Sequence, residues 1–180
     1  IRVSGEAVPF TIALRIPDWC GEENGGFRVK GVKDSECTKK DGYLYVTKCW
    51  KPGECISLEL AMDVKIMQAD PMVREDIGKV AVARGPMVYC LEEADNGPDL
   101  HLLTVDCSKE AETEDFTAAG EQVVSVVMDG FRQQVQPSQA GLYQPLKAAV
   151  KEPVKLHFIP YYVWANRGEN EMAVWVRQEK

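Results

Sequence analysis

The chain has 180 residues, of which 45% are hydrophobic and 27% are charged, and its formal net charge is −7 at pH 7. A chain of this size and composition can bury a core that needs no metal or disulfide. The acidic balance comes without a basic stripe, so we expect no nucleic-acid partner. No apolar run approaches the roughly 20 residues that span a bilayer, so we expect no membrane partner either.

The chain opens at Ile1 without an initiator methionine or a signal peptide, which indicates a piece of a longer protein whose start is missing. Its six cysteines form no C-x-x-C pair, and the two histidines, His101 and His157, lie far from most of them. We therefore expect free structural thiols, with a disulfide or a metal site as the alternatives. Free thiols favour a reducing compartment, so the cytoplasm is the expectation for an otherwise unknown localisation.

The first part of the chain predicts short strands separated by turns, a spacing typical of a β-sandwich. The predicted strands, taken from alternating apolar residues, are 10–16, 27–29, 43–46 and 55–60. The turn signals are 24–26, 39–42 and 51–54. Asp70 and Pro71 then break the pattern, with Asp70 as the N-cap of one helical turn that ends at Gly78.

Two apolar runs, 80–84 and 87–92, meet at Gly85 and Pro86 in the middle of the chain. Each run has the length and the β-branched or aromatic content of a buried strand. Gly85 tolerates a sharp bend and Pro86 cannot donate to a sheet ladder, so the stretch predicts two strands, or one strand bent hard. We assign Arg84, Gly85 and Pro86 to a structural joint between two β-rich halves, with Arg84 holding loop carbonyls or a carboxylate.

The remaining sequence predicts further strands at 100–105, 122–128, 154–165 and 172–176, with Pro160 marking an edge, a bulge or a bend. The acidic stretch 108–115 predicts a solvated loop. Pro137, Gly141 and Pro145 predict loops within 131–150. No long amphipathic helix is visible, so the expected fold class is all-β with little helix.

Several phrases of the sequence match a known family when they are taken in order. They are LRIPDW (14–19), GYL (42–44), WKPGE (50–54), RGPMVYCLE (84–92), IPYYVWANRG (159–168) and MAVW (172–175). Together they resemble the C-terminal part of glycoside hydrolase family 127, the β-L-arabinofuranosidases. The resemblance extends over nearly the whole chain.

The resemblance implies a multidomain parent enzyme. Family members have an N-terminal (α/α)6 barrel, in which a zinc-bound cysteine is the nucleophile and a glutamate the general acid/base of a retaining mechanism, followed by β-sandwich domains. Nothing in this chain matches the adjacent cysteines of that site, so no catalytic residue is carried over and no cofactor is expected in this chain. Zinc is expected in the missing catalytic barrel, and that barrel is the expected partner.

By the same analogy, the chain would fold into two β-sandwich, jelly-roll-like subdomains. The first sandwich of the family is discontinuous, so residues 1–77 would be completed by the last strand, 170–178. The second sandwich would take residues 78–169.

The carboxylates of Glu92, Glu93 and Asp95 form the candidate acidic cluster beside a buried strand. A retaining glycosidase needs two carboxyl groups about 5–5.5 Å apart. Adjacent strand residues point to opposite faces, so Glu92 and Glu93 would not converge, and a strand that ends in a polar loop is the favoured interpretation. The cysteines lack a neighbouring base that would activate a thiol, and the histidines are expected on the surface or on a strand face.

Exposed aromatic side chains can stack on sugar rings, and Trp19, Tyr161 and Trp164 are the candidate carbohydrate contacts. Packing in a core or against another domain is the favoured alternative, because aromatic side chains carry large apolar areas.

Three functions stay open. The one we favour is a non-catalytic accessory β-sandwich region that supports the barrel of a family 127-like enzyme, so that this chain alone would be inactive. The second is an autonomous carbohydrate-binding module for arabinose-containing glycans. The third is a protein-interaction or oligomerisation module.

Overall fold

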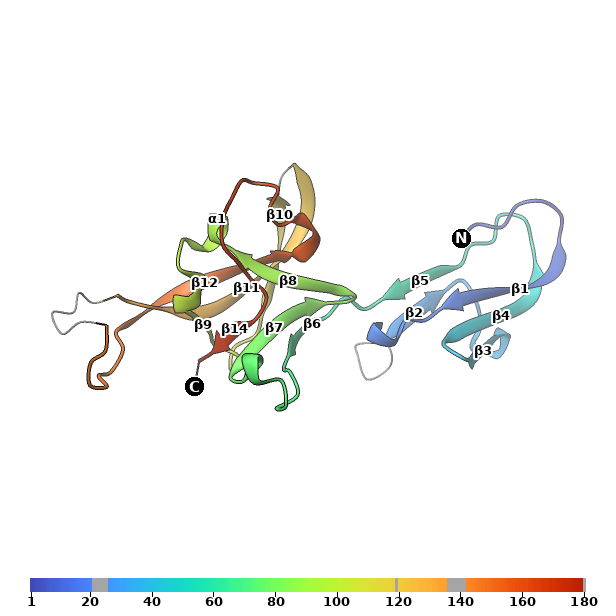
Figure 1. Ribbon diagram of the computed structural model, residues 1–180. Coiled ribbons are helices and arrows are strands. Elements are labelled where there is room, and N and C mark those ends of the chain that lie inside the picture. Colours follow the sequence, from blue (N-terminus) through green and yellow to red (C-terminus); the bar gives the residue numbers. More distant parts are fainter. Residues whose placement is uncertain (21–25, 119, 136–141, 180) are drawn as a thin grey trace. The chain divides into compact units, whose positions relative to one another are not determined.

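Figure 1 shows the computed structural model, in which the chain divides into two units, Ile1–Asp63 and Val64–Lys180. The structure describes residues 1–20, 26–118, 120–135 and 142–179. In these ranges strands dominate and the single α-helix is α1 (Glu93–Asn96), which confirms the predicted all-β class. Short 3₁₀ turns occupy Asp18–Cys20, Asp34–Glu36, Arg74–Asp76, Leu100–Leu102 and Tyr161–Val163. None of the described helices is long and apolar enough to cross a membrane.

The described part of the first unit pairs its strands in two antiparallel sheets. One sheet has the order β1–β4–β3, and the other pairs β2 with β5. The strands are β1 (Val8–Arg15), β2 (Phe27–Lys30), β3 (Cys37–Lys40), β4 (Tyr43–Trp50) and β5 (Ser57–Leu60). The core of the unit contains Val3, Leu14, Leu44, Val46, Trp50 and Ile56, of which Val3 and Ile56 lie outside the five strands.

A two-residue turn, Asp41-Gly42, connects β3 to β4, and its φ angles are +51° and +74°. Positive φ at both central residues is what a type I′ hairpin requires, and Asp-Gly adopts it readily. The predicted turn at 39–42 is therefore confirmed. Of the predicted turn at 24–26, Asn24 and Gly25 lie outside the described residues.

In the second unit, six strands close into a hydrogen-bonded ring. β7 pairs with β8, β8 with β12, β12 with β11, β11 with β9, β9 with β14, and β14 again with β7. The ring strands are β7 (Lys79–Arg84), β8 (Met87–Glu92), β9 (Leu103–Val105), β11 (Glu121–Gln133), β12 (Lys151–Pro160) and β14 (Val176–Gln178). The strands β6 (Val64–Met67), β10 (Glu112–Ala118) and β13 (Met172–Ala173) add to β7, β11 and β8. Closure gives each ring strand a partner on both sides.

The core of the second unit follows from the two-residue period of its strands. Alternate residues enter one buried cluster from five ring strands: 80 and 82, 89 and 91, 103 and 105, 126 and 128, and 156 and 158. Val176 joins them from β14, and Leu100 joins from the preceding 3₁₀ turn. The ring is therefore filled by side chains from every one of its strands.

The stretch that joins β7 to β8 is a β-hairpin. Ala83 pairs with Val88 and Arg84 with Met87, and Gly85 has a φ of +56° in the turn. Of the two predicted forms, two strands is the one observed. A glycine at the first central position suits a type II′ hairpin turn, which matches the twist of the flanking strands.

Arg84 lies beside the hydroxyl of Tyr89, which donates to the Val124 carbonyl oxygen at 2.9 Å. Burial raises the pKa of Tyr89, and the charge and hydrogen bond of Arg84 oppose that rise. Arg84 thus contacts a tyrosine hydroxyl at the point where β8 is bonded to β11.

The boundary between the units differs from the predicted one at 77/78. Register pairs from Val64–Arg84 to Met67–Ala81 bind β6 to β7, so the segment 64–77 belongs to the second unit. The chain end also completes the second unit and not the first, because β14 pairs with β7 and β9, and β13 pairs with β8. The Arg84-Gly85-Pro86 turn therefore joins two strands of one unit.

Three local predictions are also corrected. Part of the predicted acidic loop is β10, which pairs with β11 on one side. β12 ends at Pro160, and the 3₁₀ turn Tyr161–Val163 follows where a strand was predicted. Asp70 accepts a hydrogen bond from the Met72 backbone N–H at 2.8 Å, but the 3₁₀ turn begins only at Arg74. Pro137 and Gly141 lie outside the described residues.

Gly130 in β11 has no room for a side chain. An added Cβ would lie 2.4 Å from the Thr104 carbonyl oxygen and 2.7 Å from Leu156 Cδ1. We expect Gly130→Ala to lower the free energy of unfolding of the second unit by about 1–3 kcal/mol, because the added methyl group would overpack the core. Backbone entropy alone would instead favour alanine in a strand by about 0.5–1 kcal/mol. Urea denaturation gives the sign, and stabilisation would contradict the steric explanation.

Candidate functional site

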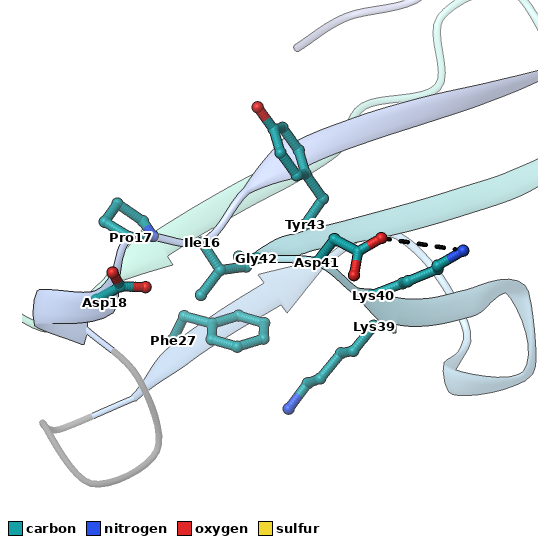
Figure 2. A pocket seen from close by; sticks show the side chains of 9 residues that line it. All are labelled: Ile16, Pro17, Asp18, Phe27, Lys39, Lys40, Asp41, Gly42 and Tyr43. Atoms are coloured by element: carbon teal, nitrogen blue, oxygen red, sulfur yellow. Dashed lines mark ion pairs between the residues drawn. The ribbon is translucent and has the colours of Figure 1, made fainter.

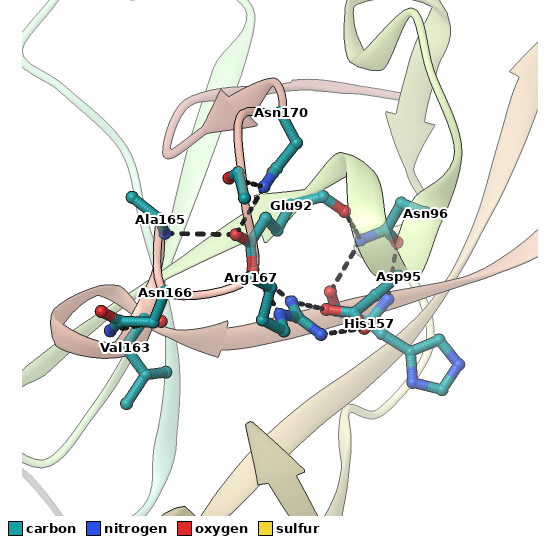
Figure 3. Close-up of polar contacts among 10 residues, drawn as sticks. Glu92, Asp95, Asn96, His157, Val163, Ala165, Asn166, Arg167 and Asn170 are labelled. Carbon is teal, nitrogen blue, oxygen red and sulfur yellow. Dashed lines mark hydrogen bonds and ion pairs between the residues drawn. The ribbon is translucent and has the colours of Figure 1, made fainter. Parts of the chain in front are cut away.

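The polar cluster in Figure 3 surrounds the carboxylate of Glu92, the last residue of β8. This side chain is fully buried. Oε1 accepts hydrogen bonds from the Ala165 backbone N–H at 3.2 Å and from Nδ2 of Asn170 at 3.0 Å. Oε2 accepts from Nε of Arg167 at 3.1 Å and also from its Nη2. Each oxygen therefore has two donors, as the burial of a charged group requires.

Arg167 also binds a second carboxylate, that of Asp95 in α1. Nη1 donates to Oδ1 at 2.7 Å and Nη2 to Oδ2 at 2.5 Å, a two-bond geometry that fixes the planar guanidinium. The guanidinium carbon lies 5.9 Å from the ring centroid of Phe116. The hydrogen bonds to Asp95 and Glu92 raise the pKa of Arg167 above its ordinary value, so its positive charge is permanent.

The side chain of Asn96 fastens α1 to β12. Nδ2 donates to the carbonyl oxygens of Glu92 at 3.0 Å and His157 at 2.9 Å, and Oδ1 accepts from the His157 backbone N–H at 2.9 Å. Nη2 of Arg132, in β11, donates to the Asn96 carbonyl oxygen at 2.5 Å. This one helical turn is therefore bonded to β8, β11 and β12, and His157 takes part through its backbone.

The end of β8 explains why Asp95 and not Glu93 meets Glu92. The strand stops at Glu92 and α1 begins at Glu93, so the expected polar loop is a helical turn. The carboxylate of Glu93 accepts from the Glu171 backbone N–H at 3.0 Å. The expectation that Glu92 and Glu93 do not converge assumed a continuing strand, which ends at Glu92, and the helical turn brings Asp95 to the same arginine as Glu92.

We call Glu92, Asp95, Arg167 and Asn170 the Arg167 latch, because they hold the segment 164–171 to the end of β8. Glu92 is sealed from solvent, and both carboxylates of the latch are bound to one arginine. A general acid or base must come within hydrogen-bond distance of its substrate, and here the arginine occupies that position at both carboxylates. The arrangement is suited to holding two chain segments together.

None of the six cysteines, all of which lie in the described ranges, takes part in a disulfide, and the buried thiol of Cys90 beside the latch is not activated. Burial, together with the nearby Glu92 carboxylate, raises the pKa of Cys90 to about 12, so its thiol stays protonated at neutral pH. Within the described ranges, no three His, Cys, Asp or Glu side chains are grouped to hold a metal ion. The donor set described here therefore does not fit a zinc site.

The three predicted carbohydrate contacts are not all brought together. Tyr161 and Trp164 are neighbours in the second unit, with ring centroids 6.3 Å apart and planes inclined at 50°. Tyr161 is 45% exposed, while Trp164 is half-buried and packs against the cluster that contains Val163. Trp19 is half-buried in the 3₁₀ turn Asp18–Cys20 of the first unit. Only the Tyr161–Trp164 pair is therefore a joint aromatic surface among these three.

A hollow of about 420 Å³ in the first unit lies beside the β3–β4 turn (Figure 2). Phe27 and Tyr43 provide its aromatic walls. Nζ of Lys39 lies 4.8 Å from the Phe27 ring centroid, and the Arg15 guanidinium lies 5.8 Å from that of Tyr43. One face of each ring is thus in contact with a cation. Sequence reasoning missed this hollow because sheet pairing assembles it, although the Asp-Gly turn signal marked its rim.

The two units define the chain as two β-sheet domains in series, and each matches a domain model of one enzyme family. Residues 1–62 match the model described as the β-L-arabinofuranosidase GH127 middle domain, and residues 64–177 match the glycoside hydrolase family 127 C-terminal domain. The chain belongs to glycoside hydrolase family 127. The predicted resemblance is confirmed, and the two matches meet where the structure divides.

The relatives that this chain resembles in sequence and structure are several times longer than the chain itself. A non-reducing end β-L-arabinofuranosidase from Bifidobacterium longum subsp. longum is 35% identical over 170 residues, which are 92% of this chain and 25% of that protein. A GH127 β-L-arabinofuranosidase from Geobacillus stearothermophilus T6 has a TM-score of 0.81 at 37% identity, over 97% of this chain and 27% of that one. A GH127 β-arabinofuranosidase has a TM-score of 0.80 at 30% identity, over 99% and 29%. The chain spans about a quarter of the length of these relatives.

Removing Arg167 tests the latch. Arg167→Leu leaves the buried Glu92 carboxylate without its cation, so we expect the free energy of unfolding of the second unit to fall by about 3–5 kcal/mol in urea denaturation. Arg74→Leu is the matched control, because Arg74 is an exposed arginine of the same unit and its substitution should cost less than about 1 kcal/mol. Similar losses in the two variants would show that the latch does not hold the unit together.

Proposed function

We propose that this chain is the non-catalytic accessory region of a β-L-arabinofuranosidase-like glycoside hydrolase. Its work is to support a catalytic domain that lies elsewhere in the parent polypeptide, an N-terminal (α/α)6 barrel that carries the zinc and the catalytic groups. The share of the relatives that the chain spans supports this proposal, since nearly all of the chain matches about a quarter of each of them.

The state of the candidate carboxylates is the observation that carries the proposal. Retaining glycosidases need an acid/base group that can reach the substrate. Here Glu92 is buried without access to solvent, and Asp95 shares the same arginine. The protonated Cys90 thiol beside them is likewise unsuited to nucleophilic attack. The chemistry of the latch serves the fold, which supports placing hydrolysis in residues outside this chain.

Hydrolysis assays test the proposal directly. We expect the 180-residue chain to release no aglycone from an aryl β-L-arabinofuranoside above the buffer rate, and the full-length parent to hydrolyse it. The paired measurement matters, because an active parent shows that the substrate is suitable. Hydrolysis by the isolated chain would overturn the non-catalytic role, and an inactive parent would overturn the assignment of its activity.

Sugar binding is the second candidate function, and the exposed Tyr161 beside Trp164 is the observation that favours it. A supporting region with no sugar site should give a flat tryptophan fluorescence titration with arabinose-containing oligosaccharides up to millimolar concentration. A saturable change that disappears in Tyr161→Ala but persists in Tyr143→Ala, an exposed tyrosine remote in sequence, would establish the binding module instead.

A further inference from the structure

A hollow of about 490 Å³ lies on the second unit, where the end of the chain meets β7 and the turn before β9. Its volume is within the range of pockets that bind small molecules. Apolar side chains that belong to the core of the ring, Val176 among them, line part of it. The other residues that matter for its chemistry are Lys79, Glu171, Trp175 and Arg177. We call it the Trp175 hollow.

The position of Trp175 follows from a bend at residues 174 and 175, between β13 and β14. In an unbroken strand, residues 173 and 175 would share a face. Here Ala173 packs against the core of the ring and Val176 lies within it, while Val174 packs against the cluster that contains Cys90. Trp175 is half-buried and lines the hollow. Its indole therefore offers an apolar ring face to a bound molecule.

Two cations lie opposite each other beside this tryptophan. Arg177 in β14 is the register partner of Lys79 in β7, and both residues line the hollow. Like charges at directly opposite positions of an antiparallel pair are destabilising. The carboxylate of Asp76 is 4.0 Å from Nζ of Lys79, and Nη2 of Arg177 donates to a neutral group, the His101 carbonyl oxygen, at 2.5 Å. An anion bound between the two cations would remove their repulsion, so the hollow is suited to a negatively charged ligand.

Glu171 adds a hydrogen-bond acceptor to the hollow. Its Oε2 accepts from the Leu100 backbone N–H at 2.8 Å. A carboxylate has about four acceptor positions, so Glu171 can also accept from a hydroxyl group of a ligand. The Gln178 N–H donates to the Gly78 carbonyl oxygen at 2.9 Å, so the segments around the hollow are bonded to one another. A site held in this way loses little entropy on binding.

We propose that the Trp175 hollow binds a uronic acid residue, which is a sugar that carries a carboxylate. The carboxylate is bound by Arg177 and Lys79, one face of the sugar ring lies on the indole of Trp175, and Glu171 accepts from the hydroxyl groups. Neutral sugars, arabinose-containing oligosaccharides included, lack the charge, and simple anions lack the ring face. The inference is independent of the proposed supporting role and of the Tyr161–Trp164 surface.

Nuclear magnetic resonance tests the site directly. The 180-residue chain has four tryptophans, so isotope-labelled protein gives four indole N–H signals, and Trp175→Phe identifies the one from the hollow. D-glucuronate and D-galacturonate are titrated to millimolar concentration, with D-glucose and D-galactose as their uncharged counterparts and acetate as a carboxylate without a ring. We expect a saturable shift of the Trp175 signal with a uronate, and binding weaker by at least about ten-fold for the neutral sugars and for acetate.

Other outcomes overturn the proposal. A Trp175 signal that no probe shifts would mean that the hollow binds none of them. Equal binding of acetate and the uronates would make the site one for simple anions, and equal binding of glucose and glucuronate would mean that the cations take no part. A shift of the Trp164 signal alone, abolished by Tyr161→Ala, would place sugar binding on the Tyr161–Trp164 surface instead.

A charge-removing substitution makes the test specific. Arg177→Gln should weaken uronate binding by at least about ten-fold, because the carboxylate loses one of its two cations. Arg74→Gln is the matched control, since Arg74 is an exposed arginine of the same unit in a 3₁₀ turn away from the hollow. Lys79→Gln removes the other cation and carries the same expectation if Arg177→Gln does not fold. Uronate binding by these variants as tight as that of Arg74→Gln would overturn the assignment.

Discussion

The burial of one carboxylate, that of Glu92, determines much of the second unit. A charge removed from water costs several kcal/mol unless donors replace the lost solvent. The donors come from Ala165, Arg167 and Asn170, which lie 73 to 78 residues further along the chain. The end of β8 can therefore be buried only when the segment 164–171 has reached it. The two events are coupled, and the latch links the middle of the chain to its end.

The same coupling reaches the ring of strands. The latch segment runs directly into β13, which pairs with β8, and then into β14, which pairs with β7 and β9. β14 is the strand that closes the ring, and it contributes Val176 to the core. β7 and β8 form one hairpin, so the latch binds one strand of this hairpin, β8, and β14 pairs with its other strand, β7. β14 has two register pairs with β7 and two with β9, and the latch before it in the chain supplies further bonds that hold this end of the chain in place.

Sequence patterns predicted those turns and strands that depend on residues close together in the chain. The Asp41-Gly42 turn and the strands on either side of Gly85 and Pro86 follow from turn chemistry and two-residue periodicity. The partners of Glu92 did not follow, because an ion pair between residues 75 apart has no local signature. β10 was missed since its acidic side chains stay solvated while its backbone pairs with β11. The unit boundary was missed because it depends on the pairing of β6, a four-residue edge strand.

The distribution of polar and apolar side chains in the chain agrees with the supporting role that we propose. Where polar groups are concentrated, at Glu92, Asp95 and Asn96, their hydrogen-bonding capacity is directed at the chain itself, and the most deeply buried carboxylate faces a permanent cation. Where the chain turns outward, between β6 and β7, it presents methionine, isoleucine and valine. A catalytic region would show the reverse arrangement, with reactive polar groups open to a cleft and apolar side chains inside. Polar groups that are satisfied within the chain itself are what the proposed supporting role requires, because that role needs a stable fold and no reactive side chain.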